Sequence, residues 1–336
     1  MGTAGSVRAV VRVLVATSLA AMVVGCSNGG GDTTITVGAG DSAQSRLIAE
    51  IYAQALARAG AHAVVRDRLG QRADYLAALD AGTVTVVGDT SGDLLRAFDS
   101  SATTTAPDDA AAKSIEDRHA AADASAVPSG APATPVASVA GDLSRSLPEG
   151  LVVSDIADAA DLPAQLALAP ASAARLPADV RALAPRCGEL SLGIATGHDL
   201  DPLRIAPDPQ RDVLTPLHEV YGCDITRHTT FGSDSELRKA LLDGHVDAGV
   251  FTSAVALLPG GSGDLAVVAD PDHAFRAQNV IPLLRQGALA QQQIKKLNHV
   301  AGELTTADFA LLIREVRDQH QPVADVARAW LDEHSL

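Results

Sequence analysis

The stretch ITVGAGDSAQSRLIAEIY, residues 35–52, decides the fold. It predicts a short β-branched strand, a glycine loop and then a helix with Leu47, Ile48, Ile51 and Leu56 along one apolar stripe. A loop between a strand's carboxyl end and a helix's amino end gathers free backbone N–H groups, and ligands of open α/β sheets bind at such places. Residues 38–44 are therefore the first candidate ligand loop.

The rest of the chain repeats this alternation of strands and helices. Strands are expected at 63–66 and 83–87, and again at 151–154, 165–169, 190–195, 246–251, 265–268 and 280–284. Helices are expected at 73–79, 213–221, 234–242, 291–304, 306–320 and 322–334. Polar loops follow strands in both halves, at 38–44 and 88–93 and then at 195–199 and 252–253. Two α/β lobes whose polar loops face one cleft make a ligand clamp that closes at a hinge.

The amino terminus has the order of an export signal. Arg8 and Arg12 precede an apolar run at 13–24, and Val23-Val24-Gly25-Cys26 resembles a bacterial lipobox. We expect a lipoprotein signal peptide at 1–25, lipidation of Cys26 and a tether at 26–32, which places the protein on the outer side of the cytoplasmic membrane. An ordinary secretory signal with a chance cysteine is the alternative.

Charge and cysteine content restrict the function further. Without Arg8 and Arg12, 24 basic residues stand against 41 acidic ones, a net charge of −17, which disfavours nucleic acids and anionic lipid as partners. Cys187 and Cys223 remain after Cys26, and an even pair in an exported chain favours a disulfide. A metal site is the alternative, but no histidine lies at a suitable spacing. No metal and no cofactor are expected.

The composition changes at about 100–142, where Pro, Ser and Ala dominate. Such a segment lacks the apolar surface to offset its ordering entropy, so we expect a mobile surface insertion there.

The chain resembles the substrate-binding lipoproteins of osmoprotectant (glycine betaine, carnitine, choline) ABC importers, especially their actinobacterial members. The likeness is carried by AEIYAQAL at 49–56, YLAALDAG at 75–82, LHEVYGC at 217–223 and AQNVIPL at 277–283. It implies an α/β, type II periplasmic-binding-protein clamp with lobe 1 at 33–165, lobe 2 at 166–264 and a return to lobe 1 at 265–336. It also implies a monomer that captures a small solute, delivers it to ABC permease subunits and is not an enzyme.

One departure from the family bears on the solute. Relatives hold a quaternary ammonium in an aromatic cage, because ring faces attract a diffuse cation. Their Pro-Glu-Tyr-Thr-Gly stretch aligns with GDTSG at 88–92, so Thr90 replaces the cage tyrosine. The lining is then expected to be rich in hydrogen-bonding groups and to suit a polyol, a sugar-like compound or a compact amine. The ligand-binding residues expected are Gly40, Asp41, Ser42, Gln44, Tyr75, Asp89, Thr90, Ser91, Thr196, His198, Phe231, Thr252 and Ser253.

Other functions have less support in the sequence. Residues 38–43 match the G-x-G-x-x-A pattern of dinucleotide-binding enzymes, yet an exported clamp offers no catalytic set. The sequence offers no G-x-S-x-G elbow between a strand and a helix, since its one match to that pattern, residues 25–29, falls at the expected lipobox and tether, and the H-E-x-x-H motif of hydrolases is missing. His198, Asp199 and Asp201 form the best acid–base cluster, for which a solvated loop is the simpler interpretation. A clamp that has lost transport and acts as a sensor or envelope partner is the main alternative.

Overall fold

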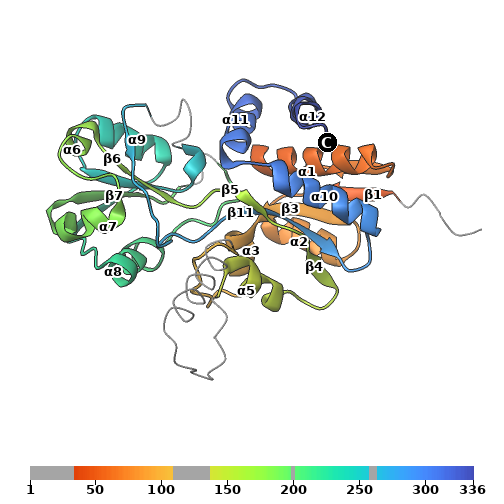
Figure 1. The fold of residues 1–336 in the computed structure, drawn as a ribbon, viewed down its shortest axis with the longest axis horizontal. Helices are drawn as coiled ribbons and strands as arrows, with labels where there is room; N and C mark the ends of the chain where they lie inside the picture. Colours follow the sequence, from red (N-terminus) through yellow and green to blue (C-terminus); the bar gives the residue numbers. More distant parts are fainter. Residues whose placement is uncertain (1–33, 109–136, 198–200, 257–262) are drawn as a thin grey trace, which may run out of the picture. The chain divides into compact units, whose positions relative to one another are not determined.

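The computed structural model describes residues 34–108, 137–197, 201–256 and 263–336 (Figure 1). The chain from Thr34 to Leu336 forms one compact unit, which is the one described below. The expected signal peptide, Cys26 and the tether therefore lie outside the described residues. So do His198, Asp199 and residues 109–136 of the expected insertion.

Residues 35–52 form the centre of the first lobe. Strand β1 (Ile35–Gly38) leads through the glycine loop into helix α1 (Ala43–Arg58), whose N-cap Ser42 accepts a hydrogen bond from the Ser45 amide. The four residues of the predicted apolar stripe are each at most 1% exposed. Full burial of such a side chain contributes about 1.5–3 kcal/mol, so this face anchors α1 to the sheet.

The first sheet has the order β2-β1-β3-β11-β4, with β5 also paired to β11. Its strands are β2 (Ala63–Arg66), β3 (Val86–Thr90), β4 (Leu151–Val153), β5 (Ala157–Asp161) and β11 (Asn279–Arg285). Strands β1, β2 and β3 are parallel, and β11 runs antiparallel to β3. The first lobe is this sheet with its helices.

Helices cover both faces of the first sheet (Figure 1). One apolar cluster joins α1 to α10 (Gln291–Glu303), α11 (Thr306–Arg317) and α12 (Val323–Glu333). The other joins α2 (Arg72–Asp80), α3 (Ser91–Phe98) and α5 (Val139–Ser146). Because both faces are covered, β3 is buried along its whole length.

The second sheet, with its helices, forms the second lobe and has the order β10-β6-β9-β7-β8. Its strands are β6 (Gln165–Leu168), β7 (Ser191–Ala195), β8 (Arg227–Phe231), β9 (Ala248–Phe251) and β10 (Ala266–Val267). The helices around it are α6 (Pro170–Ala173), α7 (Val180–Leu183), α8 (Thr215–Tyr221) and α9 (Asp234–Leu242), with a π-helical turn, η2 (Pro209–Leu214), before α8. Two short 3-10 turns, η1 (Ala184–Glu189) and η3 (Ala254–Ala256), complete it.

Two sequence predictions are confirmed by this arrangement. The chain folds into two α/β lobes, as expected for the clamp. Cys187 and Cys223 form a disulfide, with a Cα–Cα distance of 5.3 Å, inside the apolar cluster of the second lobe. The chain passes from one sheet to the other twice, between β5 and β6 and between β10 and β11.

The strand expected at 83–87 is displaced along the chain. Strand β3 runs to Thr90 and α3 begins at Ser91, so residues 88–93 are not a loop. The cause is a long-range pairing, because β11 binds the end of β3 with Thr90 opposite Val280 and Asp89 opposite Ile281. Local β-propensity carries no information about a partner strand that lies so far along the chain.

Three further differences concern boundaries and missing elements. The return to the first lobe, expected at 265, comes later, because β10 pairs with β6 in the second sheet. The insertion expected to end at 142 ends earlier, because α5 begins at Val139 and buries Leu143. Strands β5 and β8 were not predicted, since their sequences ADAAD and RHTTF carry few of the large apolar residues that mark strands.

Candidate functional site

The polar groups of the predicted ligand loop stabilise the loop itself. The Gly40 amide donates to Ser45 Oγ at 2.9 Å, and Ser42 Oγ accepts from the Ser45 amide at 3.0 Å. Asp41 Oδ1 accepts from the Gly70 amide at 3.3 Å. Ser42 and Gly40 are buried, and Gln44 is half-buried. Much of the hydrogen-bonding capacity expected for a ligand therefore serves to cap α1 and to join it to the loop before α2.

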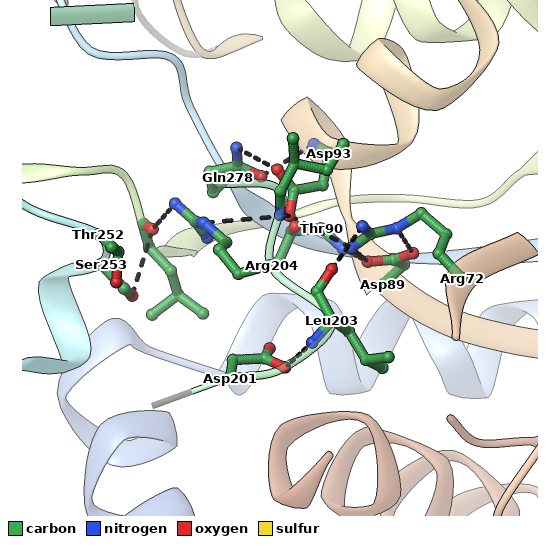
Figure 2. Close-up of polar contacts among 12 residues, drawn as sticks. Arg72, Asp89, Thr90, Asp93, Asp201, Leu203, Arg204, Thr252, Ser253 and Gln278 are labelled. Carbon is green, nitrogen blue, oxygen red and sulfur yellow. Dashed lines mark hydrogen bonds and ion pairs between the residues drawn. The ribbon is translucent and has the colours of Figure 1, made fainter. Parts of the chain in front are cut away.

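Asp89 is the centre of a buried polar network at the end of β3 (Figure 2). Arg72 binds its carboxylate in a bidentate manner, with Nε to Oδ2 at 2.8 Å and Nη2 to Oδ1 at 2.9 Å. The Tyr75 hydroxyl donates to Oδ2, and the Thr90 amide donates to Oδ1 at 2.8 Å. Burial, reinforced by the charge of Asp89, raises the pKa of the Tyr75 phenol. The carboxylate thus has four donors from its own chain and is fully hydrogen-bonded.

A segment of the second lobe, Asp201–Ile205, docks against this network; we call it the docking segment. Its Leu203 carbonyl accepts from Arg72 Nη1 at 2.6 Å (Figure 2). The Leu203 side chain is 6% exposed and belongs to the apolar cluster of the first lobe, together with Tyr75. It lies so close to the glycine loop that a Cβ atom at Gly40 would stand 2.7 Å from Leu203 Cδ1. The docking segment therefore fills the space beside the predicted ligand loop.

The two ends of the docking segment are also held. Asp201 Oδ1 accepts from the Leu203 amide at 2.9 Å. Burial raises the pKa of Asp201. Arg204 is 9% exposed and donates through Nη2 to the Leu162 carbonyl at 3.0 Å. The Arg204 contact joins the second lobe to the chain crossing after β5, while Leu203 packs beside the loop before α1.

Asp93 accepts further hydrogen bonds from both lobes. It is 4% exposed and accepts from Arg72 Nη2 at 3.2 Å, from Gln278 Nε2 at 3.1 Å and from the Ile205 amide at 3.3 Å. Arg204 Nε lies 3.9 Å from its Oδ2. Sequence reasoning missed Arg72, Asp93, Arg204 and Gln278. A buried strand followed by Asp-x-x-x-Asp at 89–93 was the one local signal, and the arginines that answer it come from distant segments.

A cavity of about 290 Å³ opens on the other side of Asp93 and Arg204. It is lined from the first lobe by α3 and residues 100–105, and from the second lobe by η2, α8 and Thr252. Residues 274–278, which connect the two sheets, complete the wall. Of the predicted ligand-binding residues that the structure describes, only Thr252 lines this cavity.

The other predicted residues fall into separate groups. Gln44, Thr252 and Ser253 meet Asp201 and Arg204 around a space of about 10 Å³, about enough for one water molecule. Thr196 Oγ1 donates to the Phe231 carbonyl at 3.1 Å, and that pair lies on the edge side of the second sheet. Ser91 Oγ accepts from the Asn279 amide at 3.1 Å and so binds β11. His198 lies outside the described residues, and the ligand role of the whole set stays a prediction.

Aromatic rings contribute little to these spaces. Tyr75 is 1% exposed and its ring packs in the first lobe's core, while Phe251 is fully buried beneath the guanidinium of Arg238. Tyr52 and Trp330 belong to the core around α1. Within the described chain, Phe275 is the single aromatic side chain that lines the 290 Å³ cavity. That cavity has no cage of rings for a quaternary ammonium.

Across 34–108, 137–197, 201–256 and 263–336, no group of three His, Cys, Asp or Glu side chains has an arrangement that could hold a metal ion. None of the helices in these ranges is both long and apolar enough to cross a bilayer.

Comparisons with known proteins give a consistent result. Residues 33–172 and 204–333 match the family model for the substrate-binding domain of ABC-type glycine betaine transport systems. The fold is similar to a crystal structure titled glycine betaine/carnitine/choline ABC transporter, with a TM-score of 0.64 and 15% identity over 90% of this chain and 98% of that one. It is also similar to apo YehZ from Escherichia coli, with a TM-score of 0.63 and 16% identity over the same shares. No curated protein matches the chain. At these identities the solved structures show a common fold.

Proposed function

Because the chain belongs to the family of substrate-binding domains of ABC-type glycine betaine transport systems, we propose that it is the solute-capturing lipoprotein of an ABC importer. Family members bind a small molecule for an ABC permease and are not enzymes. In the proposal, Cys26 carries the lipid that holds the chain on the outer face of the cytoplasmic membrane, and the chain works there as a monomer.

The observation that carries the proposal is the 290 Å³ cavity, because both lobes contribute to its wall. Its volume is close to the lower limit of small-molecule sites, which is about 300 Å³. A solute bound there touches α3 of the first lobe and α8 of the second at once, so its binding favours the closed arrangement of the two lobes. The hydroxyl-rich wall and its one aromatic ring support a small polar solute over a quaternary ammonium.

Calorimetry on the chain from residue 27 onward tests this proposal. Glycine betaine, carnitine and choline are compared with a panel of neutral polyols, sugars and small organic acids. We expect saturable binding of a small polar solute at a stoichiometry of one. Micromolar binding of choline would contradict the preference for hydrogen-bonding solutes, although it would keep the transport role.

The lipid anchor needs its own experiment. In cells that process lipoproteins, the native chain is expected in the membrane fraction, and a Cys26→Ala variant in the soluble envelope fraction. Equal fractionation of the two chains would contradict lipidation at Cys26.

A second candidate function, a clamp that no longer transports, is favoured by the docking segment. Asp89 has its full set of donors, and Leu203 occupies the space beside the Gly40 loop. In this reading the closed arrangement of the lobes is permanent and presents a fixed surface to another envelope protein. A broad thermal-shift screen that finds no ligand for the folded chain, together with no permease encoded beside it, would favour this candidate.

A further inference from the structure

Four arginines line the 290 Å³ cavity: Arg96, Arg204, Arg211 and Arg276. Three acidic residues stand against them in the same wall, namely Asp93, Asp212 and Glu219. In a chain with a formal net charge of −15, a cavity wall with an excess of guanidinium groups runs against the overall composition. The positions of the carboxylates decide whether the positive charges are neutralised.

Two of the three carboxylates are already committed. Asp93 accepts from Arg72 and lies near Arg204, as described above. Asp212 forms ion pairs with both Arg96 and Arg211 and also accepts from the Asp208 amide at 2.7 Å. Glu219 is exposed, so solvent screens its charge. The carboxylates of the cavity wall therefore do not neutralise all of its guanidinium groups.

That excess is located at Arg276. Within the part of the chain that the structure describes, Arg276 forms no ion pair, and its Nη2 donates to the Ala102 carbonyl at 2.5 Å. Burial and the nearby charge of Arg96 lower the pKa of this guanidinium, and the charge of Arg211 acts in the same direction. Asp212 and Asp93 oppose this effect without reversing it. A half-buried cation that faces other cations is stabilised by an anion placed between them.

We propose that this cavity binds the carboxylate of a small hydroxylated organic acid at Arg276 and Arg96, an inference that rests on the proposed solute-binding function. Guanidinium groups bind carboxylates with paired, charge-assisted hydrogen bonds. Thr105, Thr215 and Thr252 line the same cavity and can serve the hydroxyl groups of the acid. The Thr252 hydroxyl donates to Asp234 at 2.5 Å, so it serves the acid as an acceptor. Ala164, Ile205 and Phe275 give an apolar wall for its carbon chain. A solute with only a cationic group meets like charges here.

The test compares acids with neutral molecules of the same skeleton. Gluconate and glycerate are titrated into the chain by calorimetry, beside sorbitol and glycerol, and beside choline and glycine betaine. We expect at least one acid to bind, and its neutral counterpart to bind at least about tenfold more weakly, since a hydrogen bond to a charged group is worth roughly 1.5–3 kcal/mol. Added salt is expected to weaken the binding of the acid but not the binding of a neutral solute.

Variants then locate the carboxylate. Arg276→Gln is expected to lower the affinity for the acid at least about tenfold. Arg276→Lys is expected to lower it less, because lysine keeps the positive charge. Arg328→Gln is the matched control, since Arg328 is an exposed arginine of α12 paired with Asp325. Arg96→Gln gives a second variant in case Arg276→Gln disturbs residues 100–105, and circular dichroism confirms that each variant is folded.

The outcomes separate this inference from the proposed function. If Arg276→Gln and Arg96→Gln both leave the affinity for the acid unchanged, the proposed carboxylate site is wrong. Binding of sorbitol, choline or glycine betaine as tight as that of the acids overturns the ligand class and keeps the solute-binding function. Failure of every solute, in this panel and in the broad screen, overturns both.

Discussion

Arg72 is the residue on which the contact between the lobes depends most. Its guanidinium binds Asp89 and Asp93 in the first lobe and the Leu203 carbonyl in the second. Both the Arg72 and the Asp89 side chains are nearly buried, at 11% and 6% exposure. If a buried carboxylate loses its cationic partner, its desolvation still costs free energy, but the ion pair no longer compensates for that cost.

Arg72→Ala is therefore expected to lower the free energy of unfolding by about 3–5 kcal/mol in urea denaturation. Arg145→Ala is the matched control, because Arg145 pairs with Asp142 at the surface with its side chain 68% exposed. Its loss is expected to cost under about 1 kcal/mol. Similar small changes in both variants would show that the network is not a stabilising contact.

Asp161 sets a pH dependence at the chain crossing after β5. Burial raises the pKa of its carboxyl group to about 6, although the Gln278 amide donates to it. In the unfolded chain the pKa of an aspartate is about 3.9. Between about pH 3.9 and about pH 6 the folded chain therefore binds more protons than the unfolded chain, and its stability falls as the pH rises. The stabilisation is complete below about pH 4 and lost through about pH 6.

Asp161→Asn isolates this effect, because the asparagine oxygen can still accept from the Gln278 amide while carrying no charge. As the pH rises from about 4 to about 7, we expect the free energy of unfolding of the variant to increase by roughly 2–3 kcal/mol relative to that of the native chain. Urea titrations at several pH values measure the difference. A difference independent of pH would contradict the raised pKa.

Among the elements, the docking segment is the one that turns two lobes into one packed unit. Leu203→Ala removes its apolar contact and is expected to lower the free energy of unfolding by about 2–4 kcal/mol. Leu311 of α11, which is 43% exposed, provides the control, and Leu311→Ala is expected to cost under about 0.5 kcal/mol.

A double-mutant cycle with Gly40→Ala tests the contact directly. A Cβ atom at Gly40 meets Leu203 Cδ1 at 2.7 Å and the Gly70 carbonyl oxygen at 2.9 Å. Gly40→Ala should cost less in the Leu203→Ala background, by at least about 0.5 kcal/mol, because one of the two clashes is gone. Additive effects would place Leu203 away from the glycine loop in solution.

The elements also show where sequence reasoning succeeds. Helix α1 and the three carboxyl-terminal helices follow from local apolar spacing, caps and proline, and the structure forms all four. The end of β3 did not follow, because its last residues extend only by pairing with β11. Leu203 and Arg72 gave no signal, since an apolar side chain in a loop and an arginine at a helix start become meaningful only through partners far along the chain.

For the whole molecule, the two-lobed architecture was predictable and the position of the cavity was not. The alternation of strands and helices determines two sheets, and the family resemblance agreed with it. The cavity instead depends on which polar groups the folded chain has already satisfied. Asp89 and Ser42 look available in the sequence, but Arg72 and Tyr75 already bind the Asp89 carboxylate, and the Ser42 side chain caps α1.

The disulfide is a crosslink whose value can be measured on the whole molecule. Cys187 and Cys223 are 36 positions apart in the sequence, and the chain-entropy model gives such a loop a stabilisation of about 4 kcal/mol. The double variant Cys187→Ser, Cys223→Ser is expected to lose about that amount in urea denaturation. Dithiothreitol should lower the native chain's stability to the same level and leave the double variant unchanged; an effect on both would point to another cause.

That closed ring contains β7, the docking segment, η2 and α8, so the docking segment and eight of the 22 residues that line the cavity lie inside one covalent loop. Thiols stay reduced in the cytosol and pair in oxidising compartments. For a chain exported as proposed, synthesis yields a looser polypeptide that suits translocation, and oxidation afterwards completes its folding. The protein then reaches its final stability only in the compartment where it meets its solute.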